Sequence, residues 1–217
     1  RFVAKYNKAG QCIWAKSICN IKANNSNRKG SISIDVLGNV FVGGTIYSDV
    51  INGTDTLFKY VQGVHAFVSS FSQVDGSLNW IRISGSNALR SDSLINEAYC
   101  FSVQADNNGG VYTTGSFIDE MYIDSTANDK TYMIAVNSIA GAAFLLKYDI
   151  AGTLQWKRMV TRNDASGWGV SGNSVRTDSQ GNVYMAGSIS GTQVIQTNGE
   201  GGLESVSIPG GLAASHA

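Results

Sequence analysis

Nearly the same eleven residues occur three times in this chain of 217 residues. The copies are "DVLGNVFVGGT" from Asp35, "DNNGGVYTTGS" from Asp106 and "DSQGNVYMAGS" from Asp178. Their first residues are 71 and 72 positions apart, as the numbering shows. A fixed period of this kind is the sequence signature of a repeat architecture and limits the fold more strongly than any other feature here.

A second motif follows the same period. Its copies are "FVAKYNKAGQCIW" (Phe2 to Trp14), "FVSSFSQVDGSLNW" (Phe67 to Trp80) and "FLLKYDIAGTLQW" (Phe144 to Trp156), each with a glycine four residues before the tryptophan. Two motifs on one period do not arise by coincidence. We therefore interpret residues 1–217 as one segment made of three repeats, covering approximately 1–65, 66–142 and 143–217.

Each repeat predicts four short strands arranged as two hairpins. In the first copy one turn is centred on Gly10 and the other on Gly38. Asp35 suits the first position of the second turn because its carboxylate can accept a backbone N–H, and Gly38 suits a position that requires positive φ. We therefore interpret Asp35 and its equivalents, Asp106 and Asp178, as turn residues and not as metal ligands or catalytic groups.

The strand after each of these turns is apolar on both faces. Val40 and Val42 point one way and Phe41 the other, and the same pattern recurs at Val111 and Tyr112 and at Val183 and Tyr184. A strand that is apolar on both faces is covered on both faces. Small antiparallel sheets that stack face to face and repeat along a chain are typical of β-propeller blades. Glycines late in the three strands predict a bulge or a close backbone approach; they are Gly44, Gly115 and Gly187.

The two spaced motifs together resemble the bacterial β-propeller repeat often called the SBBP repeat. The resemblance covers essentially the whole chain, with departures at "SSF" in the middle copy and at Gly110. It implies propeller architecture, often within large surface or secreted proteins, and no single activity. We therefore expect an all-β chain of β-propeller blades, with three four-stranded antiparallel repeats and inserted hairpins.

The period exceeds the roughly 40–50 residues of an ordinary blade, and the surplus follows Thr45, Ser116 and Ser188. These inserts predict the added hairpins. Three repeats are fewer than the roughly four to eight blades of a propeller and leave open edges. The chain begins and stops at one phase of the repeat, since His216–Ala217 matches His65–Ala66. We expect part of a larger propeller array, with two chains closing a six-bladed ring as the alternative.

Composition excludes several classes of function. The formal net charge of zero removes the electrostatic basis for binding nucleic acid. No apolar run reaches the length of a membrane span. The sequence shows no cofactor motif and no metal-ligating constellation, because His65 and His216 occupy one repeat position. Three cysteines, Cys12, Cys19 and Cys100, are too few for a disulfide scaffold, and we expect buried free thiols.

Other residues have structural interpretations or depend on the cellular compartment. Trp14, Trp80 and Trp156 share one repeat position, which predicts core packing. Asn24 and Asn52 match the N-glycosylation pattern, which matters only in a eukaryotic secretory route.

Alternation of strand direction places the tight turns on one rim and the long connections on the other. Functional residues concentrate on loops held by a rigid scaffold. The candidate binding residues on the long-loop rim are Asn25, Arg28, Lys29, Arg90, Asp92, Glu97, Arg162, Asp164 and Trp168. Trp168 is the one tryptophan outside the repeat pattern, and an exposed indole beside Asn and Asp suits a sugar or peptide. The alternative is a ring folded back over its own loop.

The sequence therefore predicts a non-catalytic binding or structural module of a surface, secreted or virion protein. We expect it to recognise protein or glycan through the long-loop rim, outside the cell, and to contact further blades or a second copy of itself. The alternative is a fragment of a propeller enzyme, a hydrolase or lyase with its site on the same rim.

Overall fold

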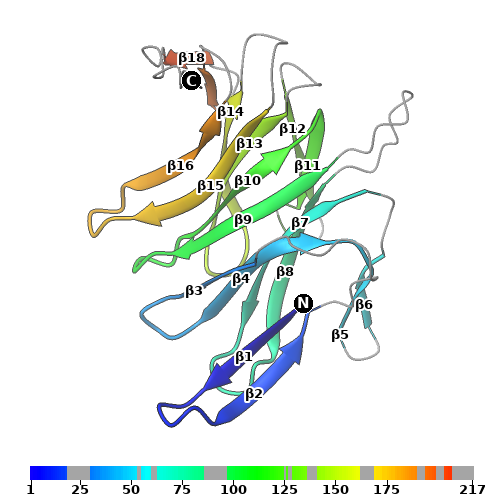
Figure 1. Ribbon diagram of the computed structural model, residues 1–217, viewed down its shortest axis with the longest axis vertical. Coiled ribbons are helices and arrows are strands. Elements are labelled where there is room, and N and C mark those ends of the chain that lie inside the picture. Colours follow the sequence, from blue (N-terminus) through cyan, green and yellow to red (C-terminus); the bar gives the residue numbers. More distant parts are fainter. Residues whose placement is uncertain are drawn as a thin grey trace, which may run out of the picture.

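The computed structural model describes residues 1–18, 30–52, 55–59, 63–85, 97–124, 126, 129–135, 141–161, 169–189, 194–198 and 203–206. These residues form eighteen β-strands and no helix (Figure 1). The all-β prediction is confirmed. The described part of the chain therefore contains no apolar helix that could cross a membrane.

The strands are short, and every ladder between them is antiparallel. Their bounds are β1 (Phe2–Tyr6), β2 (Cys12–Ser17), β3 (Ser31–Ile34), β4 (Val40–Ile46), β5 (Val50–Asn52), β6 (Asp55–Phe58), β7 (His65–Phe71), β8 (Leu78–Gly85), β9 (Ala98–Ala105), β10 (Val111–Phe117), β11 (Glu120–Asp124), β12 (Lys130–Ile134), β13 (Ala142–Tyr148), β14 (Leu154–Thr161), β15 (Val170–Thr177), β16 (Val183–Ile189), β17 (Val194–Asn198) and β18 (Leu203–Val206).

Two six-stranded sheets form the body of the molecule. Sheet 1 has the order β12-β11-β8-β7-β4-β3, and sheet 2 has the order β18-β17-β14-β13-β10-β9. Three two-stranded sheets accompany them: β1-β2, β15-β16 and β5-β6. Sheets 1 and 2 share one internal register, since β4 pairs with β7 from Val40↔Phe71 onward as β10 pairs with β13 from Val111↔Tyr148 onward.

The prediction of four-stranded sheets is wrong for sheets 1 and 2. Each contains the four predicted strands and also the inserted hairpin of the following repeat. In sheet 1 this hairpin is β11-β12, which joins β8 through Tyr122↔Gly85 and Ile123↔Ser84. The physical reason is that the outer edge of β8 presents backbone N–H and C=O groups that a further strand can satisfy.

The core lies on both faces of sheet 1. On one face Phe41, Val68 and Ile123 pack in a cluster with Cys100 and Leu146 of sheet 2. On the other face a second cluster joins β1-β2 to sheet 1 through Val3, Trp14, Phe67 and Ile83. Strand β4 is buried along its whole length, as its two apolar faces predicted.

The third copy of this strand differs from the prediction. Tyr184 of β16 is 59% exposed, and Val183 is half-buried. The prediction that β16 is covered on both faces is therefore wrong. Among the described strands β16 pairs only with β15, and the exposure of its residues shows that no described sheet covers both of its faces.

Serine side chains on β3 and β9 accept backbone hydrogen bonds from the equivalent strand of the next repeat. Ser31 Oγ accepts a hydrogen bond from Val103 N (3.1 Å), and Ser102 Oγ accepts one from Val175 N (3.3 Å). The second bond repeats the first one period later. Strands β3, β9 and β15 therefore follow one another with the same local geometry.

The turn prediction is confirmed, and the tryptophan prediction is confirmed for the first two copies. Gly38, Gly109 and Gly181 have φ values of +84°, +82° and +85°, which a glycine adopts without the strain of a Cβ. At the late-strand position, a Cβ on Gly115 would overlap the carbonyl oxygen of Tyr99. Trp14 is buried and Trp80 packs against the core as predicted, whereas Trp156 is half-buried outside both core clusters, with its ring centroid 6.0 Å from that of Tyr112.

Candidate functional site

The tight turns and the inserted hairpins lie at opposite ends of the strands. Figure 1 shows the β1-β2, β3-β4, β9-β10 and β15-β16 turns along one side, whereas the β5-β6 and β11-β12 hairpins lie on the other. We call these two sides the short-turn rim and the long-loop rim. Any site made from variable connections therefore belongs to the long-loop rim.

The carboxylates of the short-turn rim are occupied by their own turns. Asp106 Oδ1 accepts hydrogen bonds from Asn108 N (2.8 Å) and Gly110 N (2.7 Å), and its Oδ2 accepts one from Tyr112 Oη (2.9 Å). Burial, and then the bond to Asp106, raises the pKa of Tyr112 to about 12. The turn interpretation of Asp106 is confirmed.

Asp178 repeats this arrangement one period later. Its Oδ1 accepts from Gln180 N and Asn182 N, and its Oδ2 accepts from Asn182 Nδ2 and Tyr184 Oη. The hydrogen bond from the Asn182 side chain is the main cause that lowers the pKa of Asp178. These carboxylates stabilise hairpins and are poor candidates for ligand binding.

Glu97 is the one predicted site residue that lies within the described residues. Asn25, Arg28, Lys29, Arg90, Asp92, Arg162, Asp164 and Trp168 lie outside them. Glu97 is half-buried and directly precedes β9, at the end away from the β9-β10 turn. Its carbonyl oxygen accepts from Ile118 N (3.0 Å), and a backbone bridge joins it to Val64.

An aromatic pair adjoins this glutamate. Tyr99 Oη donates a hydrogen bond to Glu97 Oε2, and the ring of Tyr99 stacks on Phe101 with centroids 6.0 Å apart and planes 8° apart. Phe101 is half-buried and is the extra residue of a bulge, because Ser102 and Cys100 pair with the consecutive residues Thr114 and Gly115. A carboxylate beside stacked rings combines charge, hydrogen bonding and a flat apolar face.

Sequence reasoning missed Tyr99 and Phe101. An aromatic residue in a predicted strand is ordinarily assigned to the core, and Tyr99 is largely buried. A usable signal was divergence between repeats: the bulge that holds Phe101 in β9 holds Asn173 in β15. A position that keeps its backbone geometry while its side chain changes is free to take a specific role.

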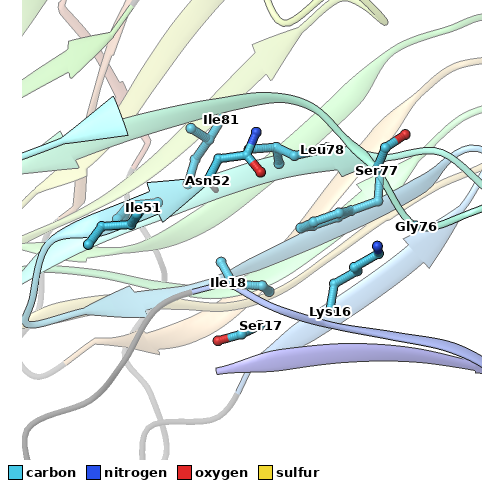
Figure 2. A pocket seen from close by; sticks show the side chains of 11 residues that line it. Lys16, Ser17, Ile18, Ile51, Asn52, Gly76, Ser77, Leu78 and Ile81 are labelled. Atoms are coloured by element: carbon cyan, nitrogen blue, oxygen red, sulfur yellow. The ribbon is translucent and has the colours of Figure 1, made fainter. Parts of the chain in front are cut away.

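A second candidate is a cavity of about 210 Å³ between β2, β5 and β8. Figure 2 shows Lys16 and Ser77 on one side of it and Ile51 and Asn52 on the other. The full lining is Lys16, Ser17, Ile18, Val50, Ile51, Asn52, Phe71, Gly76, Ser77, Leu78 and Ile81. It is smaller than the roughly 300–1,000 Å³ of typical ligand pockets.

The cavity exists because one inserted hairpin stays separate. Strand β11 joins β8, and β17 joins β14, but β5 has a ladder only with β6 among the described strands. The polar residues that line the gap between β5 and β2 include Lys16, Asn52 and Ser77. It fits a small polar group, and none of its residues was predicted as a site.

His65 has no catalytic or metal-binding setting. It is fully buried, with its ring 5.1 Å from Phe58 and 6.2 Å from Tyr122, and Tyr122 Oη lies 3.4 Å from its Nδ1. Within the described residues no three His, Cys, Asp or Glu side chains are placed to hold a metal ion. His65 acts as a packing residue, and His216 lies outside the described residues.

The cysteines differ from one another. Cys100 is a buried free thiol as predicted, and burial raises its pKa to about 12, so the thiolate is not accessible for chemistry. The prediction is wrong for Cys12, which is exposed because β1-β2 is a two-stranded sheet with an uncovered outer face. Cys19 and the glycosylation candidate Asn24 lie outside the described residues, whereas Asn52 is exposed.

Comparison with known proteins adds no relative to these observations. No family model matches the chain, and no curated protein matches it in sequence.

Proposed function

We propose that this chain is a non-catalytic binding or structural module, built of β-propeller blades, from a surface, secreted or virion protein. It recognises a protein or a glycan outside the cell through the long-loop rim. The observation that carries this proposal is the separation of the connections. Short, hydrogen-bonded Asp turns occupy one rim, and the β5-β6 and β11-β12 hairpins lie on the other. The Glu97–Tyr99–Phe101 group is at the start of β9, at the end away from the β9-β10 turn.

The scaffold supports recognition because it holds the rim rigidly. Strand β9, which presents Tyr99 and Phe101, is paired with β10 along its length and is mostly buried. Recognition groups held by a rigid sheet lose little conformational freedom on binding. A ring face packs against the C–H face of a sugar or against a peptide side chain, and the Glu97 carboxylate accepts hydrogen bonds from hydroxyl or amide groups.

A glycan array probed with the 217-residue protein tests this function. We expect at least one class of glycan to bind, and Phe101→Ser and Trp168→Ala each to weaken binding at least about tenfold, as loss of an aromatic binding residue does. The control is Val74→Ser, which changes an exposed side chain in the β7-β8 turn on the short-turn rim and leaves binding unchanged. Equal losses in Val74→Ser and Phe101→Ser would contradict the assignment to the long-loop rim.

Stability measurements separate a binding role of Trp168 from a packing role. An exposed indole can be removed with a change in unfolding free energy within about 1 kcal/mol. A loss of several kcal/mol in Trp168→Ala would assign the ring to the core and remove it as a binding residue. A silent array would overturn the glycan branch of the proposal and leave protein recognition, tested with the same three variants in binding assays against the surface on which the protein is found.

A further inference from the structure

Neighbouring sheets are joined by a contact between a Trp-x-Arg pair and a turn. Trp80 Nε1 donates to Ile150 O (2.8 Å), and Arg82 Nε donates to Gly152 O (2.7 Å), so β8 of sheet 1 holds the β13-β14 turn of sheet 2. The guanidinium of Arg82 also lies 5.6 Å from the centre of the Trp80 ring.

The tryptophan half of this contact occurs one repeat earlier, where Lys16 stands in place of the arginine. Trp14 Nε1 donates to Gln73 O (3.2 Å) in the β7-β8 turn. A Cβ on Gly76 would lie 2.6 Å from the Trp14 ring, just as a Cβ on Gly152 would lie 2.7 Å from the Trp80 ring. The tryptophan therefore covers the glycine of the following turn in both cases.

Both parts of a third such contact are present but do not meet: the Trp-x-Arg pair is on β14, and the turn is the one at Gly10. Trp156 and Arg158 on β14 adopt the arrangement of Trp80 and Arg82, with Arg158 5.4 Å from the ring and its Nη1 donating to Lys157 O (2.9 Å). Within the described residues neither Trp156 Nε1 nor Arg158 Nε has a turn carbonyl as its partner. At the other end of the molecule Gly10 has φ +79°, and no atom of the described residues outside its own chain neighbours lies within 4 Å of the position its Cβ would take.

The unpaired strand edges are likewise at two separate places, one on β16 and one on β1. Strand β16 holds the repeat position of β4 and β10, and β1 holds that of β7 and β13, yet among the described strands β16 pairs only with β15 and β1 only with β2. Transfer of the β4-β7 register to the two free edges gives Val183 opposite Tyr6 and Gly187 opposite Phe2. The side chains that this ladder would cover are exposed: Phe2 77%, Tyr6 60% and Tyr184 59%.

A groove lies where the missing strands would fit. It has a volume of about 500 Å³ and is lined by β1, β3, β4 and neighbouring residues, including Phe2, Val3, Ser31, Ile32 and Val42. In sheets 1 and 2 the corresponding space beside β7 and β13 is filled by β4 and β10. By the same repeat rule β15 would lie against β3, so that Ser174 Oγ would face Ile32 N as Ser31 Oγ faces Val103 N.

We propose that a second copy of this chain docks head to tail, with β16 of one copy pairing with β1 of the other. Trp156 and Arg158 then cover the Gly10 turn of the partner, and β15-β16 and the partner's β1-β2 complete one sheet. A contact between two different surfaces closes into a ring when the rotation allows it. Each chain supplies sheet 1, sheet 2 and the two halves of a third, so two copies give six sheets, within the range of about four to eight found in propellers.

The exposed side chains and the charge favour this partner. Both free edges carry large apolar groups, and the chain has a formal net charge of zero, so no long-range repulsion opposes self-association. The pairing register derived for β16 and β1 requires a partner strand that carries the repeat pattern of this chain. The inference is independent of the ligand on the long-loop rim.

Sedimentation analysis of two matched variants tests the proposal. We expect the protein at about 100 µM, a concentration at which micromolar contacts associate, to have twice the 23.0 kDa mass of one chain. Phe2→Asp should weaken the dimer at least tenfold, whereas Val74→Asp, at a site of equal exposure, should leave it intact. A monomer, or equal effects of the two substitutions, would overturn the proposal and assign the edges to another partner.

Disulfide trapping tests the register and also remains informative if one variant folds poorly. Cys12 and Cys19 are first replaced by serine. The pair Lys5→Cys with Tyr184→Cys is opposed in the proposed ladder, where Cβ atoms are about 4.5–5.5 Å apart, and should give a covalent dimer on oxidation. The pair Lys8→Cys with Tyr184→Cys is out of register and should not. Equal cross-linking of both pairs, or a ladder of larger oligomers, would overturn the closed two-copy arrangement.

Discussion

Phe2 and Phe144 hold the same repeat position in the same kind of strand, but their environments are opposite. Phe144 is 1% exposed between β10 and β14, whereas Phe2 is 77% exposed on β1. The same contrast separates Tyr112 on β10 from Tyr184 on β16. The burial of these residues is therefore decided by the sheets that surround the strand and not by the sequence of the strand.

Local structure forms in both environments. Strands β15 and β16 pair through seven residue pairs with the same Asp turn as β9 and β10, although β16 is largely exposed. A carboxylate that accepts the turn N–H groups and a glycine at positive φ specify the hairpin without help from the core. Turn chemistry thus determines pairing, and stacking of sheets determines burial.

The largest expected loss of stability comes from replacing Phe144, the buried residue of the first pair. Phe144→Ala should destabilise the protein by about 3–5 kcal/mol, because it leaves a cavity in the core shared by sheets 1 and 2. Phe2→Ala should change stability by less than about 0.5 kcal/mol when measured at a dilution where single chains dominate. Urea unfolding followed by fluorescence measures both. Similar losses would show that Phe2 is covered in the isolated chain.

The two Asp turns give the next comparison. Asp106 is 7% exposed, and Asp106→Ala leaves Gly110 N and Tyr112 Oη without an acceptor in a buried region, at a cost of about 2–3 kcal/mol. Asp178 makes the equivalent bonds at an exposed site, so water replaces the carboxylate in Asp178→Ala and the loss is smaller. Thermal unfolding of the two variants is the measurement. A larger loss in Asp178→Ala would contradict the order.

Gly152 and Gly10 allow a covered and an open turn to be compared at the same backbone conformation. Their φ values are +80° and +79°, and of the two Gly152 is the one covered by a tryptophan. Because of the positive φ, alanine at either site lowers the unfolding free energy by about 1 kcal/mol. In Gly152→Ala the new methyl group must also displace Trp80, which adds about 1–2 kcal/mol. Denaturant unfolding should show this difference in dilute protein. In the proposed dimer Gly10→Ala should additionally weaken association.

The sequence predicted what depends on local chemistry and missed what depends on distant edges. The period located the hairpins, and the conformations of Gly38, Gly109 and Gly181 followed from turn rules. The pairing of β11 with β8 was not predictable, because several free edges were available and the hydrogen bond that Asp124 Oδ2 accepts from Ile83 N is recognisable only once the two strands are placed side by side. The exposure of Tyr184 depends on a missing neighbour, which the strand sequence does not encode.

The candidate site was predicted only in part for a related reason. Strand alternation placed Glu97 on the long-loop rim, and the structure puts it beside Tyr99. Phe101 faces its partner ring because a bulge in β9 re-aims the side chain, and a bulge is set by the strand opposite and not by the local sequence.

The smallest expected effect concerns the β7-β8 turn, which departs from the others. Ser72 stands where Asp149 stands in the β13-β14 turn, and the carboxylate comes from Asp75 instead. Asp75 Oδ1 accepts from Ser77 N (3.1 Å) and Ser77 Oγ (2.8 Å), and these bonds are the main causes that lower its pKa to about 2. Because the folded pKa lies below the unfolded value of about 3.9, the stabilisation from this turn is complete above that pH and is lost as pH falls through about 2.

NMR titration of the Asp75 carboxyl carbon should therefore show a midpoint near pH 2. Ser77→Ala removes the hydroxyl bond and keeps the backbone bond, so the midpoint should rise part of the way towards the ordinary value. Ser48→Ala is the control, because Ser48 lies outside this turn and its Oγ bonds to the carbonyl oxygen of Asp49. A wild-type midpoint near the ordinary aspartate value would show that water, and not Ser77, solvates this carboxylate, and the Asp75 turn would then contribute nothing to acid stability.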